Sequence, residues 1–520
     1  MLHYPYQNFY EAIESNAKNE PNKTAIFIEK RKITYLKLKQ DIDTFARFLE
    51  FSGIKHGDKV AMIVSNSEEF VVALFTITKI GAVAVPLNTF LKKEEFEYIL
   101  NDCDARLLVC SAAYANETKD LLKTTKIEKI VWTDKYEHLD EQNYSFTEID
   151  MAQETHERLM KSPTLDALAC IVYTSGTTGK PKGAMLSYRN IFSNSVGAVE
   201  SFKITSKDRF IVFLPMFHSF TLSIMVILPI FACSSMVIVR SVFPFSNVLK
   251  QTLLKQVTVF LGVPTLYNAL LKAKIPWYFM WFNRVRIFIS GSAPLSEQSL
   301  NDFNAKFKRA KLLEGYGLSE CSPTVSVNRL HWQKPFSVGL PLPEIQIKIV
   351  NEERMEVKNG VVGEIMVKGD CVMQGYLNHP DATDETILNG WLLTGDLGKK
   401  DDDGFIYIVD RKKDLIISKG INVYPREIEE ILYKYEGVDA AAVIGIRNEV
   451  TCDEDVVAFI QPKEKVDLKE TEIRKYLKNH LANFKLPKHI YFVEELPKNA
   501  TGKVLKRVLK EQINKHTLLK

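Results

Sequence analysis

The sequence lacks any paired arrangement of cysteines. Its seven cysteines, in a chain of 520 residues, are scattered, odd in number and never spaced as Cys-x-x-Cys. Disulfide-rich secreted domains and structural zinc sites need paired or clustered cysteines, so both classes are disfavoured. We therefore expect a protein that works in the reducing cytoplasm.

An excess of either charge is also missing. The chain has 68 Lys and Arg against 64 Asp and Glu, which gives a formal net charge of +4. Because proteins that bind nucleic acid carry strong, clustered positive charge, we expect no nucleic-acid partner.

Membrane-spanning segments are the third absence that we expect. Residues 220–239 contain no charge and are long enough to cross a bilayer. However, Pro229 and several small polar residues interrupt this run, which favours a buried helix, a turn and a buried strand. The N-terminus shows no basic segment followed by an apolar run, so no signal peptide is expected.

The most informative stretch is 173–183, which packs hydroxyls, glycines and two lysines into eleven residues. An apolar run that predicts a buried strand, 167–172, precedes it, and a predicted helix capped by Ser187 follows. Glycines let backbone N–H groups approach a polyanion, and hydroxyls and lysines add donors for phosphate oxygens. A flexible surface loop is the alternative, although a linker does not need this ordered mixture. The stretch is not a Walker A loop, because Gly-x-x-x-x-Gly-Lys-Ser/Thr is absent.

Buried-strand patterns alternate with helical patterns through most of the chain. Such alternation implies an α/β fold with parallel sheets covered by helices on both faces. The predicted strands include 24–28, 59–64, 83–86, 210–215, 257–264, 286–290 and 311–314.

Some residues at the ends of these strands are candidates for chemistry. His218 follows the strand at 210–215, at the edge where α/β sheets place their sites, with a core histidine as the alternative. Gly291 and Gly315 also follow strands, where a flat ring can lie against bare backbone. Glu320 is a candidate ligand for a hard cation.

From Val338 onward the pattern changes to short strands broken by glycines, which predicts a small β-rich subdomain or barrel. The charge run 410–414 follows and is either a domain boundary or a solvated turn. Beyond it, helical stripes and two strands predict a compact α/β module.

Five motifs follow one another along the chain: 173–183, 316–320, 394–396, 410–414 and 497–503. Their residues and their order resemble those of the acyl- and aryl-adenylate-forming enzymes, which include acyl-CoA synthetases, luciferases and peptide-synthetase adenylation domains. The resemblance spans nearly the whole chain. It implies an N-terminal domain, residues 1–410, with two α/β sheets plus a β-barrel subdomain. It also implies a small mobile α+β C-terminal domain, residues 411–520, with its hinge near Lys413.

The resemblance further implies a reaction in two steps. A carboxylate attacks the α-phosphate of ATP with Mg²⁺, which gives acyl-AMP and pyrophosphate, and a thiol then displaces AMP. The catalytic candidates are Lys503, which would bridge the acyl carboxylate and the phosphate, together with Glu320 and His218. Magnesium is implied at Thr177 and Glu320.

The other site residues implied by the resemblance surround the nucleotide and the path of the CoA thiol. Those expected at the triphosphate are Thr174, Ser175, Gly176, Thr177, Thr178, Gly179 and Lys182. Those expected around adenine, ribose and the α-phosphate are Gly291, Ser292, Ala293, Gly315, Tyr316, Gly317, Ser319, Asp396 and Arg411. Lys413 would occupy the hinge, and Lys419 and Gly420 would line the path of the thiol.

Within the family, 389–396, 410–414 and 422–429 resemble the fatty acyl-CoA synthetase signature. Peptide-synthetase domains usually have an Asp soon after the strand that ends here at Pro215, and this chain has none, which favours a plain carboxylic acid. We therefore expect a cytoplasmic, ATP-dependent long-chain fatty acid–CoA ligase of lipid metabolism, acting on a medium- or long-chain acid.

Other functions stay open. A fatty acyl-AMP ligase that loads a carrier-protein thiol commonly has an insertion after the hinge, whereas only thirteen residues separate Lys413 from Glu427. A synthetase for another small carboxylic acid and a luciferase-type enzyme are further alternatives. A catalytically silent membrane scaffold is disfavoured by the intact Lys503, Glu320 and Asp396.

The aromatic stretch 277–282 lies between Lys274 and Arg284. Core packing is the default interpretation, and contact with lipid or an acyl chain is the alternative. Peripheral contact with the inner membrane surface and homodimer formation stay open. We expect this stretch near the mouth of an acyl channel or against a membrane, with the channel lined by Phe217, Phe220, Leu222, Val263 and Pro264.

Overall fold

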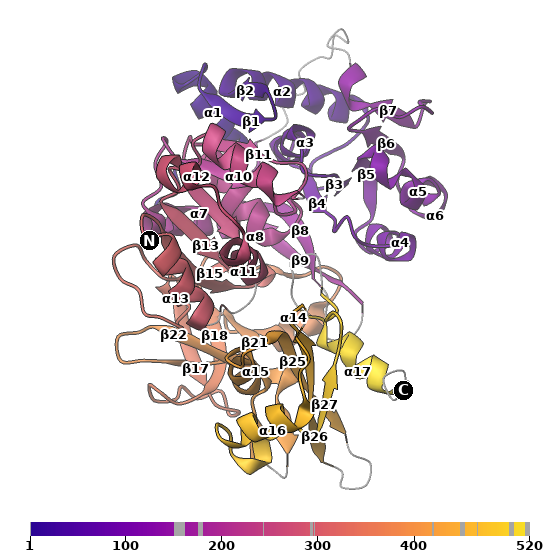
Figure 1. Ribbon diagram of the computed structural model, residues 1–520. Coiled ribbons are helices and arrows are strands. Elements are labelled where there is room, and N and C mark those ends of the chain that lie inside the picture. Colours follow the sequence, from indigo (N-terminus) through magenta and orange to yellow (C-terminus); the bar gives the residue numbers. More distant parts are fainter. Residues whose placement is uncertain are drawn as a thin grey trace.

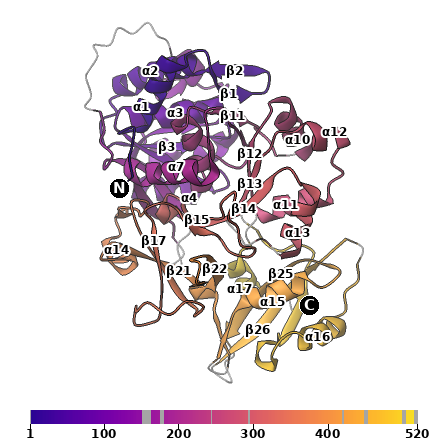
Figure 2. The same ribbon diagram turned by 90° about the vertical axis from the view of Figure 1, so that its left-hand side faces the viewer.

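The computed structural model describes residues 2–149, 162–174, 180–242, 244–291, 295, 297–418, 421–447, 453–464, 466–498 and 504–514. Two large sheets and their helices fill the upper part of the molecule in Figure 1. The gold and yellow C-terminal module lies at the lower end in both ribbon views (Figures 1 and 2).

The first sheet has nine strands among the described residues and is mostly parallel. The antiparallel additions are β15, β16 and β2. Because the other strands are parallel, the segments that follow β10, β12, β13 and β14 meet at one edge of the sheet. In spatial order the strands are β16 (Leu340–Pro341), β15 (Thr324–Val327), β14 (Lys311–Gly317), β13 (Ile287–Ser290), β12 (Val259–Gly262), β10 (Arg209–Val212), β11 (Ser235–Ile238), β1 (Thr24–Ile28) and β2 (Arg31–Thr34).

The second sheet has eight strands in the described part of the chain. In spatial order they are β19 (Gly375–Tyr376), β9 (Lys182–Ser187), β8 (Leu168–Thr174), β4 (Val83–Pro86), β3 (Lys59–Ile63), β5 (Ala105–Cys110), β6 (Lys129–Trp132) and β7 (Asn143–Ser145). Strands β8 and β9 are antiparallel neighbours. The glycine-rich stretch therefore joins two strands, and the prediction of a turn between a strand and a helix was wrong in this respect.

The physical reason is that the apolar residues after the loop are buried as a strand. Gly183 makes this pairing possible, since a Cβ there would lie 2.7 Å from Cγ2 of Ile171. Helix α7 (Tyr188–Phe202) follows β9 directly. Its predicted cap is confirmed, because the Ser187 hydroxyl accepts from the Asn190 N–H at 3.1 Å.

Helices cover both faces of the two sheets. One hydrophobic core lies between the sheets, and two further cores lie on their outer faces. The α-helices of this part are α1 (Phe9–Asn19), α2 (Tyr35–Phe51), α3 (Glu68–Lys79), α4 (Lys93–Asp102), α5 (Ala115–Thr118), α6 (Leu121–Thr124), α7, α8 (Ser219–Thr221), α9 (Leu228–Phe231), α10 (Phe245–Leu254), α11 (Pro264–Lys272), α12 (Trp277–Phe282), α13 (Glu297–Lys306) and α14 (Pro380–Thr386).

The uncharged run 220–239 folds as predicted, as buried helical turns followed by the buried strand β11. Its helical part includes a π-helical stretch, η3 (Leu222–Ile227). No helix in the described ranges is both long and apolar enough to cross a membrane.

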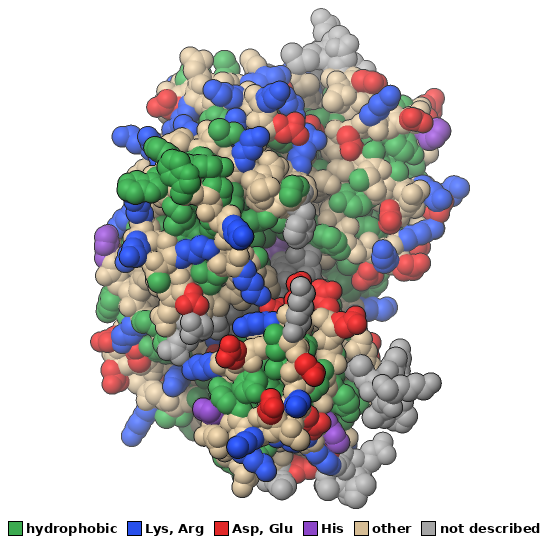
Figure 3. Space-filling view, in the orientation of Figure 1, with side chains coloured by type: hydrophobic (Ala, Val, Ile, Leu, Met, Phe, Trp, Pro, Cys, Tyr) green, Lys and Arg blue, Asp and Glu red, His purple; other side chains and the backbone are tan. Residues whose placement is uncertain are grey.

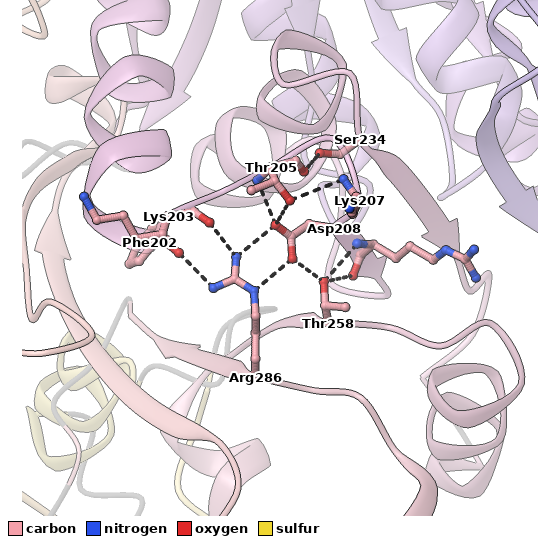
Figure 4. Close-up of polar contacts among 9 residues, drawn as sticks. Phe202, Lys203, Thr205, Lys207, Asp208, Ser234, Thr258 and Arg286 are labelled. Atoms are coloured by element: carbon pink, nitrogen blue, oxygen red, sulfur yellow. Dashed lines mark hydrogen bonds and ion pairs between the residues drawn. The ribbon is translucent and has the colours of Figure 1, made fainter. Parts of the chain in front are cut away.

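A buried polar network fixes the amino ends of β10, β12 and β13 (Figure 4). The Arg286 guanidinium donates to both carboxylate oxygens of Asp208, each at 2.9 Å, and to the Phe202 carbonyl at 2.9 Å. The Thr258 hydroxyl donates to Asp208 at 2.7 Å. Burial alone would raise the pKa of Asp208, but these donors outweigh it and the pKa is lowered. The network anchors the strand ends opposite to the edge where the predicted site residues lie.

The β-rich region after Val338 is a five-stranded antiparallel sheet. Its strands are β17 (Gln346–Val350), β18 (Gly363–Lys368), β20 (Ile387–Leu388), β21 (Trp391–Lys400) and β22 (Ile406–Arg411). No pairing among the described strands closes it, so the expected barrel is an open sheet. Closure is not needed, because Ile347, Ile365 and Leu392 of this sheet already bury themselves in the main core.

The C-terminal module has hydrophobic cores of its own. Its elements are β23 (Ile416–Ser418), β24 (Ile421–Val423), α15 (Pro425–Tyr433), β25 (Val438–Arg447), β26 (Glu454–Pro462), α16 (Glu470–Lys478), β27 (His489–Phe492) and α17 (Lys506–Asn514). The Arg426 N–H donates to the Asp410 carboxylate at 2.9 Å, which ties α15 to the end of β22. The boundary at 410/411 stays a prediction.

Candidate active site

The candidate site begins at the carboxyl end of β10. The chain runs from β10 to His218, whose half-buried ring caps α8: its Nδ1 accepts from the Phe220 N–H at 3.4 Å. Burial lowers the pKa of His218 to about 4. The imidazole is therefore neutral near pH 7 and carries its proton on Nε2, which makes it a hydrogen-bond donor rather than a charge partner.

The short helix α8 connects this point to two neighbouring strand ends. The Ser219 hydroxyl lies 2.9 Å from the Ser319 hydroxyl. The Phe220 ring lies against Gly291, where a Cβ would be only 2.7 Å from two ring carbons. Gly291 is thus required for close approach of an aromatic ring, and here that ring belongs to the protein itself.

A second cluster joins β14, β21 and β22. The Tyr316 hydroxyl donates to Asp396 Oδ2 at 2.7 Å, and Arg411 Nε lies 3.3 Å from Asp396 Oδ1. Asp396 and Arg411 face each other across the β21–β22 pair, and Asp396 is only 6% exposed. Burial and the Asp396 charge raise the pKa of Tyr316. The tyrosine therefore remains a donor, and the Asp396 carboxylate oxygens can accept further hydroxyl groups.

The third cluster surrounds Glu320 at the glycine-rich loop. Glu320 Oε1 accepts from the Tyr376 hydroxyl at 3.0 Å and from the Thr174 hydroxyl at 3.4 Å. The Met373 N–H donates to the Glu320 carbonyl at 2.9 Å. The Lys182 ammonium lies 5.5 Å from the centre of the Tyr376 ring. Residues from both large sheets thus meet around one carboxylate.

This cluster fits a magnesium ion. Magnesium prefers oxygen ligands and is typically held by one or two carboxylates together with phosphate oxygens and waters. Glu320 has its second oxygen, Oε2, without a hydrogen bond among the described residues, so it can serve as such a ligand. No group of three or more His, Cys, Asp or Glu side chains suited to a metal occurs in the described ranges, and phosphate would have to complete the shell.

Two glycines keep strand β14 close to its neighbours. A Cβ at Gly317 would lie 1.8 Å from the Pro323 carbonyl oxygen, and one at Gly315 would lie 3.3 Å from the Ser326 carbonyl oxygen. The expected loop at 315–317 is therefore the end of a strand, and glycine is needed there for backbone packing. Backbone packing therefore requires glycine at these two positions whether or not an adenine ring is bound.

A buried acid stands just before these glycines. Glu314 is 8% exposed, and its Oε1 accepts from the Leu295 N–H at 3.3 Å. Burial raises the pKa of Glu314 to about 7, with Arg426 of α15 acting in the opposite direction. The carboxyl group is thus close to half-protonated at neutral pH.

Several predicted site residues cannot be placed. Ser175, Gly176, Thr177, Thr178, Gly179, Ser292, Ala293, Lys419, Gly420 and Lys503 lie outside the described residues. Lys413 is exposed in a short 3₁₀ turn, η5 (Lys412–Asp414), immediately after β22. Its expected hinge role stays a prediction.

Sequence reasoning missed Tyr376, Ser219 and Glu314. Tyr376 reaches Glu320 because β19 pairs with β9, a contact between residues about 190 positions apart that no local pattern announces. Ser219 follows His218 directly, so its proximity to the strand edge was a usable signal. Glu314 lies in an apolar strand pattern, and a lone acid there was the signal for a buried, perturbed carboxyl group.

Two protein-family models and a curated relative match this chain. The model of the "AMP-binding enzyme" family matches residues 13–377, and that of the "AMP-binding enzyme C-terminal domain" matches 427–503. A "Long-chain-fatty-acid--CoA ligase" of Salmonella typhimurium is 32% identical over 542 aligned residues, which cover 98% of this chain and 95% of that protein.

Two solved structures have a closely similar fold. ATP-bound MatB from Rhodopseudomonas palustris has a TM-score of 0.88 and 32% identity, covering 97% of this chain and 99% of that one. The o-succinylbenzoate CoA synthetase MenE from Bacillus subtilis, in complex with its acyl-adenylate intermediate, has a TM-score of 0.84 and 28% identity, covering 97% and 98%.

Proposed function

Because this chain belongs to the AMP-binding enzyme family, we propose that its acid substrate is a medium- or long-chain fatty acid. The similar proteins reported above include adenylate-forming acyl-CoA synthetases. The proposed reaction joins the acid to ATP as acyl-AMP with release of pyrophosphate. The CoA sulfur then forms the thioester, and AMP leaves.

The apolar character of the acid side of the site carries the choice of substrate. Residues 210–239, which include the segment from β10 through His218 to η3, contain no Lys, Arg, Asp or Glu. Phe217, Leu222 and Val263 are almost fully buried. A second carboxylate such as that of o-succinylbenzoate would be costly to bury without a cation, whereas an alkyl chain needs none.

The nucleotide side would hold ATP through the clusters already described. Asp396, with Tyr316 and Arg411 beside it, would accept the ribose hydroxyls. Lys182 and the glycine-rich stretch would bind the triphosphate. Glu320 would hold magnesium, which would supply positive charge to offset that of the phosphates. The neutral His218 would donate a hydrogen bond near the acyl carboxylate, where it adds no charge that would hold the substrate back from attack.

The second step would use the C-terminal module. Lys503 would stabilise the first step only, and rotation about a hinge at Lys413 would bring Lys419 and Gly420 to the thiol. A carrier-protein thiol in place of CoA is the second candidate acceptor. The short connection from Lys413 to Glu427, without an insertion, favours CoA.

A panel of carboxylic acids tests this proposal. Pyrophosphate and thioester formation would be measured with ATP, Mg²⁺ and acids from acetate to hexadecanoate, with and without CoA. Since a buried methylene is worth about 0.8 kcal/mol, kcat/KM should rise about fourfold per added carbon from butyrate towards dodecanoate. A maximum at acetate, an aromatic acid or o-succinylbenzoate would overturn the fatty-acid assignment while leaving adenylate chemistry intact. Thioester formation with a carrier protein but not with CoA would favour the second candidate.

A further inference from the structure

Helix α12 presents a cluster of aromatic side chains to solvent. Trp277, Trp281 and Phe282 are 71%, 64% and 63% exposed, and Tyr278 is 46% exposed. Core packing, the default expectation for this stretch, is therefore wrong for four of its six residues. We call these four side chains the aromatic face. Large exposed aromatic groups gathered on one short helix are unusual for a surface that only meets water.

Helix α12, which carries the aromatic face, is anchored to the rest of the protein. Phe279, on the opposite side of α12, is 3% exposed and belongs to the core formed with β12 and β13. Arg309 donates from Nη1 to the Trp281 carbonyl at 2.9 Å, and its guanidinium lies 5.3 Å from the centre of the Trp281 ring. The rings of the aromatic face are thus exposed on a helix whose other side is fixed by packing and hydrogen bonding.

The surroundings of the aromatic face are positively charged. Residues 209–296 contain eight Lys or Arg and no Asp or Glu, although Arg240, Lys272 and Arg286 pair with acids from elsewhere in the chain. Lys274 and Arg284, which flank α12, are exposed and have no ion-pair partner among the described residues. Figure 3 shows hydrophobic side chains gathered over α12 with Lys and Arg side chains around them. Lys250 and Leu254 of α10, which packs against α12, extend the same surface.

We propose that this surface docks on a bilayer that contains anionic lipids. Trp and Tyr favour the boundary between headgroups and acyl chains, and flanking cations are attracted to the negative surface potential. Aromatic rings on one side with basic residues around them are the pattern of an interfacial rather than a spanning element. Lys274 and Arg284 would contact lipid phosphates while Trp277, Trp281 and Phe282 enter the headgroup region.

A second copy of this chain fits the surface less well. A two-fold interface places the same patch on both subunits, so one patch ringed by cations would face another patch ringed by cations. An anionic bilayer supplies the opposite charge. This proposal goes beyond the acid and nucleotide chemistry proposed above, and membrane binding can be measured without any substrate.

Vesicle flotation tests the proposal on the full-length protein. The probes are vesicles of phosphatidylcholine alone and vesicles in which about 30% of the lipid is phosphatidylglycerol. The wild type should bind the anionic vesicles, and added salt should weaken binding, because surface charges are screened. Trp277→Ser/Trp281→Ser should weaken binding roughly tenfold or more. Lys274→Gln/Arg284→Gln should weaken it about 30-fold, from about 1 kcal/mol per cation.

The matched control is Phe51→Ser/Trp332→Ser, which removes two other exposed aromatic rings. This variant should bind as the wild type does, and the thermal stability of all variants should show that they fold. Because Lys274 and Arg284 are exposed, their substitution tests the proposal even if the tryptophan variant is unstable. No binding to anionic vesicles, or equal loss in the control, would overturn the proposal. Dimerisation that Trp277→Ser/Trp281→Ser abolishes, without vesicle binding, would assign the face to a second copy instead.

Discussion

Tyr376→Phe is the most direct probe of the Glu320 cluster. The substitution removes one hydroxyl, which donates to Glu320 Oε1 at 3.0 Å, and keeps the ring next to Lys182. A hydrogen bond to a charged group is worth about 1.5–3 kcal/mol, and Tyr376 is half-buried, so the lower end applies. Loss of a partner that orients a metal ligand typically costs 10–100-fold in metal affinity. We expect the Mg²⁺ concentration for half-maximal activity to rise 10- to 30-fold. The value of kcat should be nearly restored at saturating Mg²⁺.

The assay is pyrophosphate release at fixed ATP and acid over a range of Mg²⁺ concentrations. Binding of Mn²⁺ in the presence of ATP, followed by electron paramagnetic resonance, gives a readout that does not depend on turnover. Tyr98→Phe is the matched control. Tyr98 of α4 is also a half-buried tyrosine, and its hydroxyl donates to the Pro181 carbonyl at 3.4 Å rather than to a carboxylate. An unchanged Mg²⁺ requirement in Tyr376→Phe, or an equal change in Tyr98→Phe, would refute this reasoning.

Three further predictions concern Glu314, Lys503 and Lys413. The folded-state pKa of Glu314 is raised from 4.5 to about 7, so its contribution to stability is present below pH 4.5 and is lost as pH rises through 7. Between pH 4.5 and pH 8, the free energy of unfolding of Glu314→Gln should rise by about 3 kcal/mol relative to that of the wild type, as measured by denaturant unfolding. A difference in stability that does not change with pH would contradict the buried, protonated state. Lys503→Ala should slow adenylation by two to three decades, about 3–4 kcal/mol, while sparing thioester formation from supplied acyl-AMP, and equal loss in both steps would count against its role. Lys413→Pro should leave acyl-AMP formation intact and slow transfer to CoA, because proline fixes φ; a normal transfer rate would exclude Lys413 as the hinge.

The fold was largely predictable because its strands are short, apolar and regularly interrupted by helical patterns. The strands at 24–28, 59–64 and 286–290 are present within a residue or two of the predicted ends. Burial on both faces of a parallel sheet makes such runs continuous and easy to recognise. The exact partner of each strand was not predictable, as β9 shows: a six-residue segment after a glycine-rich stretch joins the sheet only because β8 and β19 lie on either side of it.

The site was predictable to the extent that its residues lie in motifs. The resemblance named Tyr316, Asp396 and Arg411, and the structure brings these three side chains together from three strands. Tyr376 escaped, because its proximity to Glu320 depends on long-range packing, whereas Ser219 was missed although it stands beside the candidate His218. For Trp277 and Trp281 the sequence left core packing and contact with lipid or an acyl chain both open, and the exposure of these side chains excludes core packing.

One measurement tests the central proposal most directly: a single-turnover experiment in two stages. Enzyme in excess over dodecanoate is mixed with ATP and Mg²⁺ without CoA, and the quenched products are identified by mass spectrometry. CoA is then added to a parallel sample. We predict dodecanoyl-AMP and pyrophosphate in equal amounts in the first stage, followed by conversion of that acyl-AMP to dodecanoyl-CoA and AMP in the second. Formation of ADP and phosphate, or acyl-AMP that persists after CoA is added, would contradict the proposed function.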